Sequence, residues 1–321
     1  MLAYLARRVA WSLATLFGVM LLLFALFFLV ATPDDVARKA LGDKAMPEAI
    51  AQWKANHGYD KPRVWNAAAP LDTMLVDHLR RLLTFDFGRS DADDTPIIDR
   101  LRAGLGPSLS LTVPLFLLGV LASIGLALTA AYLQGSWFDR STLIACVLLM
   151  SVSLLLYIVA GQYVLGKVLR WFPISGFDPT PAVIARFLAL PVLIGLAANT
   201  GQDTLFYRTL FLDERSREYV RTAYAKGCSP AQVMRRHVLR NTLIPILTDL
   251  VIEIPFLFTG AIVLESFFGI PGLGAMTVEA MQGNDFATLR VMVFIGSLLF
   301  IAGQLMTDIA YTLADPRVRL E

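Results

Sequence analysis

Long apolar runs separated by charged segments set the pattern of this chain. A helix needs about 20 apolar residues to cross the ~30 Å hydrocarbon core of a bilayer. The runs predict six transmembrane helices, at about Val9–Ala31, Leu105–Leu133, Ser141–Leu165, Phe187–Phe206, Leu243–Leu264 and Leu289–Ala314. The fourth run is the least regular, because Asn199, Gln202 and Asp203 interrupt it. The predicted fold is an all-α membrane protein.

The first run has a competing interpretation as a secretory signal peptide. It is longer than a typical signal-peptide core of about 7–15 residues, and no small-x-small cleavage site follows it. We therefore interpret residues 1–31 as an N-terminus followed by a retained transmembrane helix.

A long polar segment separates the first two runs and predicts a small extramembrane subdomain, residues 32–104. Between Thr32 and Arg102 it carries 11 Lys/Arg and 12 Asp/Glu residues, so it is almost neutral. Pro47 suits the first position of a helix, and His57-Gly58 suits a helix end. Residues 105–314 then form a five-helix core, and residues 315–321 form a tail.

The distribution of basic residues predicts the orientation in the membrane. Cytoplasmic loops carry an excess of Lys and Arg. One side of the predicted topology holds Arg7, Arg8, Arg140, eight Lys/Arg between Arg208 and Arg240, Arg317 and Arg319. The other side holds the neutral subdomain, with Lys167, Arg170 and Arg186 as the exceptions. Both termini are therefore expected in the cytoplasm, and the subdomain outside it.

Composition and motifs narrow the functional classes. The chain has 321 residues, 56% of them hydrophobic, and a net charge of only +2, which gives no indication of nucleic-acid binding. No G-x-x-x-x-G-K-[ST] loop is present, so ATP binding by this chain is not expected. H-E-x-x-H and G-x-S-x-G are absent as well. The three histidines are scattered, and Cys146 and Cys228 are expected to be free thiols.

The segment between the fourth and fifth runs is basic and predicts a helix–turn–helix. Residues 218–226 read as a helix with Val220, Ala223 and Tyr224 on one face, and Gly227 ends it as glycine does at a positive-φ turn. Ser229 and Pro230 suit the N-cap and first position of a second helix, in which Ala231, Met234 and Val238 share a face. Such a segment is either a loop held by anionic lipid or a docking element for a soluble partner.

The stretch EYVRTAYAKGCSPAQVMRRHVLRNTLIPIL (218–247) resembles the cytoplasmic coupling motif of ABC importer permeases. Ala223 and Gly227 match its Ala-x-x-x-Gly core, and Ile244-Pro245 matches the later pair. The resemblance to the oligopeptide/dipeptide/nickel permease family extends along the chain through FDFGRS (85–90), WFPISG (171–176), ALP (189–191), LESFFGIPGLG (264–274) and DPRV (315–318). FLDERSREYV (211–220) and DPRVRLE (315–321) look most like the Yej-type branch, which is linked to uptake of antimicrobial peptides.

This resemblance implies a bacterial inner-membrane subunit of a larger machine. Its partners would be a second homologous permease, two ATP-binding subunits and a periplasmic solute-binding protein. ATP and Mg would be held by the ATP-binding subunits, and this chain would hold no cofactor. Segment 213–241 would fit a cleft on an ATP-binding subunit, with the coupling residues Glu218, Ala223, Lys226, Gly227, Ser229, Pro230, Met234 and Arg235.

Acidic residues in the apolar runs are candidates for the translocation pathway, because charge is costly in a bilayer and usually faces a cavity or a partner. They are Asp203, Asp249, Glu253, Glu265 and Asp308. Asp249 and Glu253 are four residues apart and share a helix face. We expect Asp249, Glu253 and Glu265 to line the pathway. The alternative is a structural role, and for Glu265 a place in the family pattern at the outer helix end.

Two functions from different classes follow. The first is a permease subunit of an ATP-driven importer, forming half of the pathway for peptides or a related small solute. The second is an intramembrane enzyme, a protease or lipid-processing protein, but no nucleophile–base pair stands out to support it. The sequence does not identify the solute, which could be a peptide of any length, a nickel chelate or an antimicrobial peptide.

Overall fold

The computed structural model describes residues 2–30, 33–42, 45–57, 59–66, 69–259 and 261–314. Within these ranges the regular elements are helices, and β-pairing is limited to an isolated bridge between Arg89 and Pro96. The predicted tail, residues 315–321, and Gly58 lie outside the described residues.

The helices follow one another closely along the chain. The first part contains α1 (Leu2–Phe24), the π-helix η1 (Ala25–Val30), α2 (Pro33–Leu41), α3 (Pro47–His57), α4 (Met74–Leu83), α5 (Ile97–Tyr132), α6 (Trp137–Met150), α7 (Leu154–Gly161) and the π-helix η2 (Gln162–Val168). The second part contains α8 (Ile184–Arg215), α9 (Glu218–Ala225), α10 (Pro230–Gln232), the π-helix η3 (Val233–Val238), α11 (Leu239–Thr259), α12 (Ile262–Phe268), α13 (Leu273–Gln282) and α14 (Phe286–Ala314). Helix α3 begins at Pro47 and ends at His57, as the sequence predicted.

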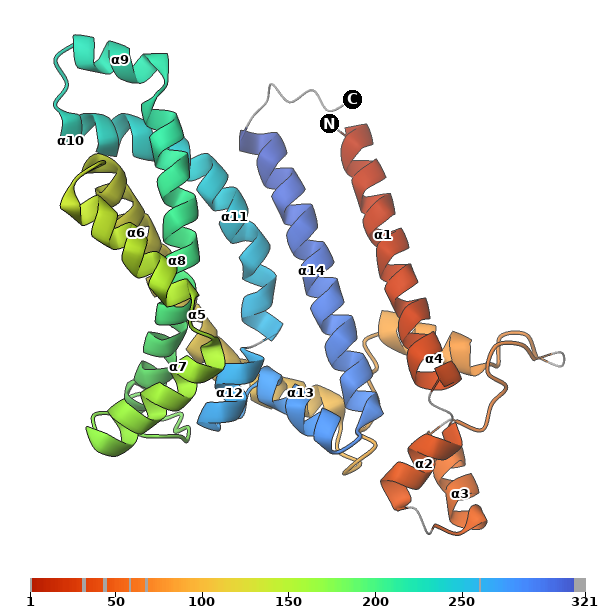
Figure 1. Cartoon of the computed structure of the whole chain (residues 1–321). Coiled ribbons are helices and arrows are strands. Elements are labelled where there is room, and N and C mark those ends of the chain that lie inside the picture. Colours follow the sequence, from red (N-terminus) through yellow and green to blue (C-terminus); the bar gives the residue numbers. More distant parts are fainter. Residues whose placement is uncertain are drawn as a thin grey trace.

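Four helical stretches in the described chain are long and apolar enough to cross a bilayer: Arg7–Leu29, Ile97–Tyr132, Ile184–Arg215 and Phe286–Asp308. Two bent pairs raise this number to six if each is one span: α6 with α7 and η2, bent by 91°, and α12 with α13, bent by 80°. Helix α11 contains 21 residues and packs along α14 (Figure 1). The six predicted runs correspond to α1–η1, α5, α6–α7–η2, α8, α11 and α14. Helix α11 is not among the stretches that meet this length and apolarity test, and the bent pair α12–α13 follows it in the chain.

Two of the predicted runs are interrupted, which corrects the sequence-based boundaries. The third run turns sharply after Met150, because Ser153 caps a new helix by accepting a hydrogen bond from the Leu156 N–H at 3.4 Å. The fifth run ends early: α11 stops at Thr259, and Leu264 belongs to the separate helix α12. Hydrophobicity alone does not reveal these breaks, since both sides of each break are apolar.

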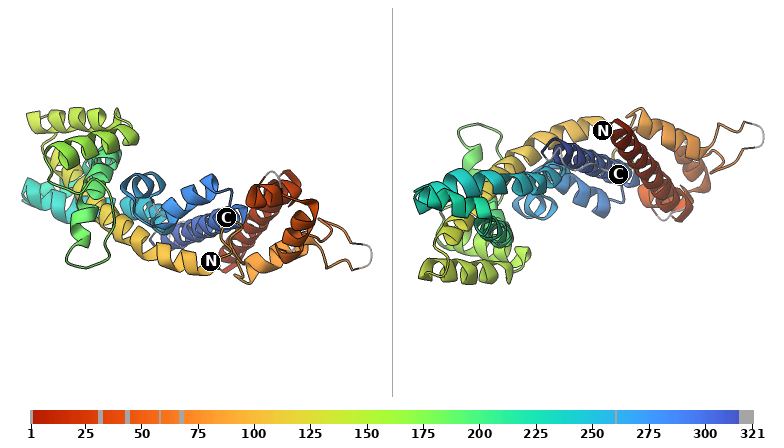
Figure 2. Two further views of the ribbon diagram at one scale, coloured as in Figure 1. Left: turned by 90° about the horizontal axis from the view of Figure 1, so that it is seen from below. Right: turned by 90° about the horizontal axis from the view of Figure 1, so that it is seen from above.

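The long helices stand in an open row and not in a closed bundle. Successive contacts join α1 to α14, α14 to α11, α11 to α5, α5 to α8 and α8 to α6. Figure 2 shows α1 and the subdomain at one edge of this elongated row and α6 to α10 at the other, with α14 between them. In Figure 1, α9 and α10 lie at the same end of the row as the start of α1 and the end of α14, whereas α2 and α3 lie at the opposite end.

Small residues allow the long helices to approach one another, as is common in membranes. A Cβ on Gly201 of α8 would lie 2.8 Å from the carbonyl oxygen of Cys146 on α6. A Cβ on Gly303 of α14 would lie 2.2 Å from Cγ of Pro255 on α11. Any larger side chain at either position would push the two helices apart.

A hydrogen-bonded junction anchors the segment after α4 to the start of α14. The buried Asp285 carboxylate accepts from the Ser90 hydroxyl at 2.6 Å and from the Asp91 N–H at 3.0 Å. In return the Asp91 carboxylate accepts from the N–H of Ala287 at 2.8 Å, in the first turn of α14. Part of the FDFGRS stretch therefore fixes the subdomain to a membrane helix.

Candidate coupling site and translocation cavity

The turn after α9 has the backbone geometry that the sequence predicted. Gly227 has φ of +83°, and its N–H donates to the Tyr224 carbonyl at 2.9 Å, while the Cys228 N–H donates to the Ala223 carbonyl at 3.2 Å. These two bonds form a Schellman motif, in which the positive-φ position favours glycine. The chain reverses here while the Ala223 and Tyr224 carbonyls, in the last turn of α9, remain hydrogen-bonded.

Segment 213–241, which contains α9, the turn at Gly227, α10 and η3, is called the elbow below. Its second helix starts with a complete capping box. The Gln232 N–H donates to the Ser229 hydroxyl at 3.4 Å, and the Ser229 N–H donates to the Gln232 side-chain oxygen at 3.1 Å. Pro230 occupies the first turn, where a missing N–H has no cost. The predicted N-cap and first position are both confirmed, and the helix continues through η3 into α11.

A buried apolar seam holds the elbow against the membrane helices. It joins Val220 and Ala223 of α9 to Val233, Met234 and Val238 of η3, and it is continuous with buried side chains of α5, α8 and α11. The sequence interpretation is corrected at two points: Ala231 is exposed and Val233 takes its place in the seam, and Tyr224, 37% exposed, lies outside the seam. Ala223, 4% exposed, faces the interior beside Val220.

The predicted coupling residues therefore divide into two groups. Ala223 and Met234 are buried in the seam and shape the elbow from within. Six others are exposed: Glu218, Lys226, Gly227, Ser229, Pro230 and Arg235. A shallow hollow of about 350 Å³ lies beside them, lined by Ala231, Gln232, Arg235 and Arg236. The exposed face is polar and basic, so contact with a partner would be made by charged and backbone groups.

A second feature is a half-open cavity of about 410 Å³ between α5, α8 and α11. Apolar residues of α5 form part of its wall, and the α8 side is polar. Its polar lining comprises Thr112, Asn199, Thr200, Gln202, Asp203 and Glu253. The residues that interrupted the fourth apolar run are thus brought together on one cavity, which explains their presence in a membrane helix.

The acidic residues of α8 and α11 lie on or next to this cavity. Glu253 lines this cavity, whereas Asp249 is half-buried and its carboxylate accepts a hydrogen bond from the Tyr207 hydroxyl at 3.1 Å. Asp203 lines the same cavity and was not among the residues expected to line the pathway. The interrupted apolar run at Asp203 was the available signal, but only the packing of α8 beside α11 pairs it with Glu253.

Glu265 does not line the cavity, which corrects that expectation. Its side chain has 0% exposure, and its carboxylate accepts from the Ser108 hydroxyl at 2.8 Å and from the N–H groups of Gly274 and Ala275 at 2.8 and 3.1 Å. Those amides belong to the first turn of α13, where a negative charge is favourable. Glu265 therefore fastens α12, α13 and α5 together. Asp308 is also structural, since it pairs with Arg8 of α1.

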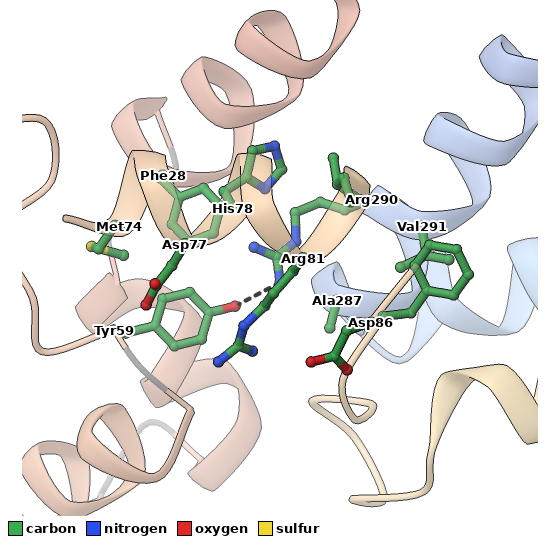
Figure 3. Close-up of a pocket in the computed structure, with 12 residues that line it drawn as sticks. Phe28, Tyr59, Met74, Asp77, His78, Arg81, Asp86, Ala287, Arg290 and Val291 are labelled. Carbon is green, nitrogen blue, oxygen red and sulfur yellow. Dashed lines mark hydrogen bonds between the residues drawn. The ribbon is translucent and has the colours of Figure 1, made fainter. Parts of the chain in front are cut away.

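At the opposite end of the row, the subdomain meets α14 around Arg290, with Arg81 of α4 lining the same pocket (Figure 3). The Arg290 guanidinium lies over the Phe28 ring at 4.6 Å from its centroid and donates to the Tyr59 hydroxyl at 3.2 Å. Burial raises the pKa of Tyr59 to about 12. His78, 6% exposed, donates from Nε2 to the Met20 carbonyl at 3.1 Å, and burial lowers its pKa to about 4. Burial at this contact therefore disfavours the protonated form of the His78 ring.

The fold and these features are those of a multi-pass, all-α membrane protein with a helix–turn–helix elbow at one end of its spans and a polar cavity among them. The family model described as a binding-protein-dependent transport system inner membrane component matches residues 119–320, and the model of the N-terminal part of such components matches residues 1–112. The chain belongs to this family.

Relatives match along the whole length of the chain. Proteins of Brucella abortus and Brucella melitensis that are named as peptide transport system permeases are each 32% identical over 325 residues, covering 100% of both chains. The glutathione transport system permease GsiC of Salmonella typhimurium is 30% identical over 319 residues, covering 99% of both chains.

These matches confirm the resemblance to ABC importer permeases of the peptide and dipeptide type. The chain is a non-catalytic permease subunit of an ABC importer, a class that works with ATPase and binding-protein partners. The intramembrane-enzyme alternative finds no support.

Proposed function

We propose that this chain forms half of the translocation pathway for peptides or a related small solute delivered by a periplasmic binding protein. The observation that carries the proposal is the half-open polar cavity among helices that form an open row. A row of helices does not enclose a pathway by itself, so a second homologous permease would complete the wall. The names of the relatives, which refer to peptides and glutathione, favour a peptide-like solute.

The proposed assembly contains this chain, the second permease, two ATP-binding subunits and the binding protein, surrounded by membrane lipid. ATP and Mg are held by the ATP-binding subunits, and this chain holds no cofactor. The elbow at 213–241 docks on an ATP-binding subunit through its exposed face, which includes Lys226, Ser229, Pro230 and Arg235. Ala223 and Met234 support that face from inside the seam.

We further propose that the protein lies in the bacterial inner membrane with both termini and the elbow in the cytoplasm and residues 32–104 in the periplasm. The excess of Lys and Arg around the elbow supports this orientation. The placement of α9 and α10 at one end of the row and of α2 and α3 at the other is consistent with it (Figure 1).

Orientation is testable by labelling single cysteines in a background without Cys146 and Cys228. A cysteine at Lys54 in α3 should react with an impermeant maleimide added from the periplasmic side, and a matched cysteine at exposed Gln232 should react only after the cytoplasmic side is opened. Labelling of the Lys54 cysteine only from the cytoplasm would contradict the proposed topology.

The function itself is tested by reconstituting the chain with its partner subunits in vesicles. Uptake of labelled peptides should require ATP and the binding protein together. The solute is best identified on the binding protein, by measuring its affinity for short peptides, antimicrobial peptides and nickel chelates. If the complete assembly hydrolyses ATP but moves none of the solutes that its binding protein holds, the proposed function is wrong.

A further inference from the structure

Tyr207 lies between the elbow and the cavity. It is on α8, is 1% exposed, and its ring belongs to the hydrophobic cluster that contains the seam residues Ala223 and Val233. Its hydroxyl donates to the Asp249 carboxylate at 3.1 Å. One side chain therefore has its apolar body in the seam of the coupling segment and its polar tip on an acid of α11.

Helical spacing extends this contact to the cavity. Asp203 precedes Tyr207 by four residues on α8, and Glu253 follows Asp249 by four residues on α11. Residues four apart lie on the same helix face. The Tyr207–Asp249 hydrogen bond thus joins two helix faces that both lead to the cavity, since Asp203 and Glu253 line it.

The orientation of Asp249 depends on this bond. Among the described residues, the Tyr207 hydroxyl is the hydrogen-bond donor that contacts the Asp249 carboxylate. A poorly solvated carboxylate is costly without a donor, and a hydrogen bond to it is stronger than one between neutral groups. Removing the hydroxyl would therefore free the carboxylate to turn.

We propose that Tyr207 is the positioning residue through which movement of the coupling segment reaches the carboxylates of the cavity. Because the seam is close-packed, a displacement of α9 and η3 moves the buried ring with it. The hydroxyl then carries Asp249, and the arrangement of Asp249, Glu253 and Asp203 changes in step with the elbow. This inference rests on the proposed function, since it assumes that the elbow receives the movement of an ATP-binding subunit.

The test uses the complete reconstituted transporter and separates positioning from charge. Tyr207→Phe keeps the ring and removes the donor, Asp249→Leu removes the acceptor, and Asp249→Asn removes the charge but keeps an oxygen that can accept. Tyr207→Phe and Asp249→Leu should each lower solute-stimulated ATP hydrolysis and uptake of a neutral solute by about tenfold, within the ~5–150-fold range typical of coupling between sites. Asp249→Asn should retain most of both activities.

The double variant Tyr207→Phe/Asp249→Leu should be no worse than the worse single variant, because both remove the same interaction. The matched control is Tyr157→Phe, which removes a tyrosine hydroxyl bonded to the Leu149 carbonyl at 2.9 Å, away from the seam and the cavity. It should transport like the parent.

Several results would overturn the proposal. They are parental stimulation in Tyr207→Phe, additive losses in the double variant, equal losses in Asp249→Asn and Asp249→Leu, or failure of Tyr207→Phe to assemble with the ATP-binding subunits. A parent transporter that shows no ATP-driven uptake would instead defeat the proposed function, so the two failures are distinguishable.

Discussion

Substitution of Gly227 gives the most direct test of the elbow as a mechanical part. Its φ of +83° lies in the left-handed region, and a Cβ built there meets no atom within 4 Å. The cost of a side chain is therefore backbone strain and not a clash. That strain is about 1–2 kcal/mol for an ordinary residue and larger for a β-branched one, up to about 3 kcal/mol.

These magnitudes predict an ordered series. Asn tolerates the left-handed region and should be mild, Ala should cost about 1 kcal/mol, and Val about 2–3 kcal/mol. For Val, this cost corresponds to a roughly 30- to 150-fold decrease in the equilibrium population of the observed turn relative to other conformations. The membrane helices are untouched, so insertion and expression should stay near the parental level while coupling falls in the order Asn, Ala, Val.

The assay combines pull-down of the ATP-binding subunits with solute-stimulated ATP hydrolysis in reconstituted vesicles. Gly42→Val is the matched control, because Gly42 also has positive φ, +96°, with no atom within 4 Å of its Cβ position, but lies beside α2 in the subdomain. It should leave assembly and stimulation unchanged. If Gly227→Val assembles and is stimulated like the parent, the turn has no role in coupling and the elbow is only a lipid-facing loop.

Three further predictions follow from the other contacts. Replacing Asp249 and Glu253 together by Asn and Gln should slow uptake of cationic solutes more than neutral ones, and equal effects in competition assays would contradict a pathway role. Burial lowers the pKa of His78 in the folded protein to about 4, below the usual ~6.5, so the unfolded chain takes up the proton at a higher pH than the folded one. The free energy of unfolding should therefore be highest above pH ~6.5 and fall by up to about 3 kcal/mol as the pH drops towards 4. Thermal unfolding in detergent measures this fall, and His78→Gln should flatten it. Ala223→Glu should lower the yield of folded protein, because it buries a charge in the seam. The exposed substitution Arg235→Glu should leave the yield unchanged and weaken pull-down of the ATP-binding subunits. Equal yields for the two variants would show that the seam is open to solvent.

Local features of the elbow were readable from the sequence because each depends on neighbouring residues. Glycine is favoured at a positive-φ position, and serine followed by proline marks a helix start, so the turn at Gly227 and the cap at Ser229 follow from short-range chemistry. The long apolar runs likewise predicted where most of the membrane helices lie, because the thickness of the bilayer sets their length.

The roles of the acidic residues could be assigned only from the tertiary structure. Asp203, Glu253 and Glu265 are all costly charges in apolar surroundings, and neither spacing nor hydrophobicity distinguishes a carboxylate that lines a cavity from one that is buried in a structural contact. Packing of α8 beside α11 brings Asp203 and Glu253 to one cavity, whereas the 80° bend between α12 and α13 turns two backbone amides towards Glu265. The sequence determined that these carboxylates required partners or a cavity; long-range contacts between helices decided which of the two each received.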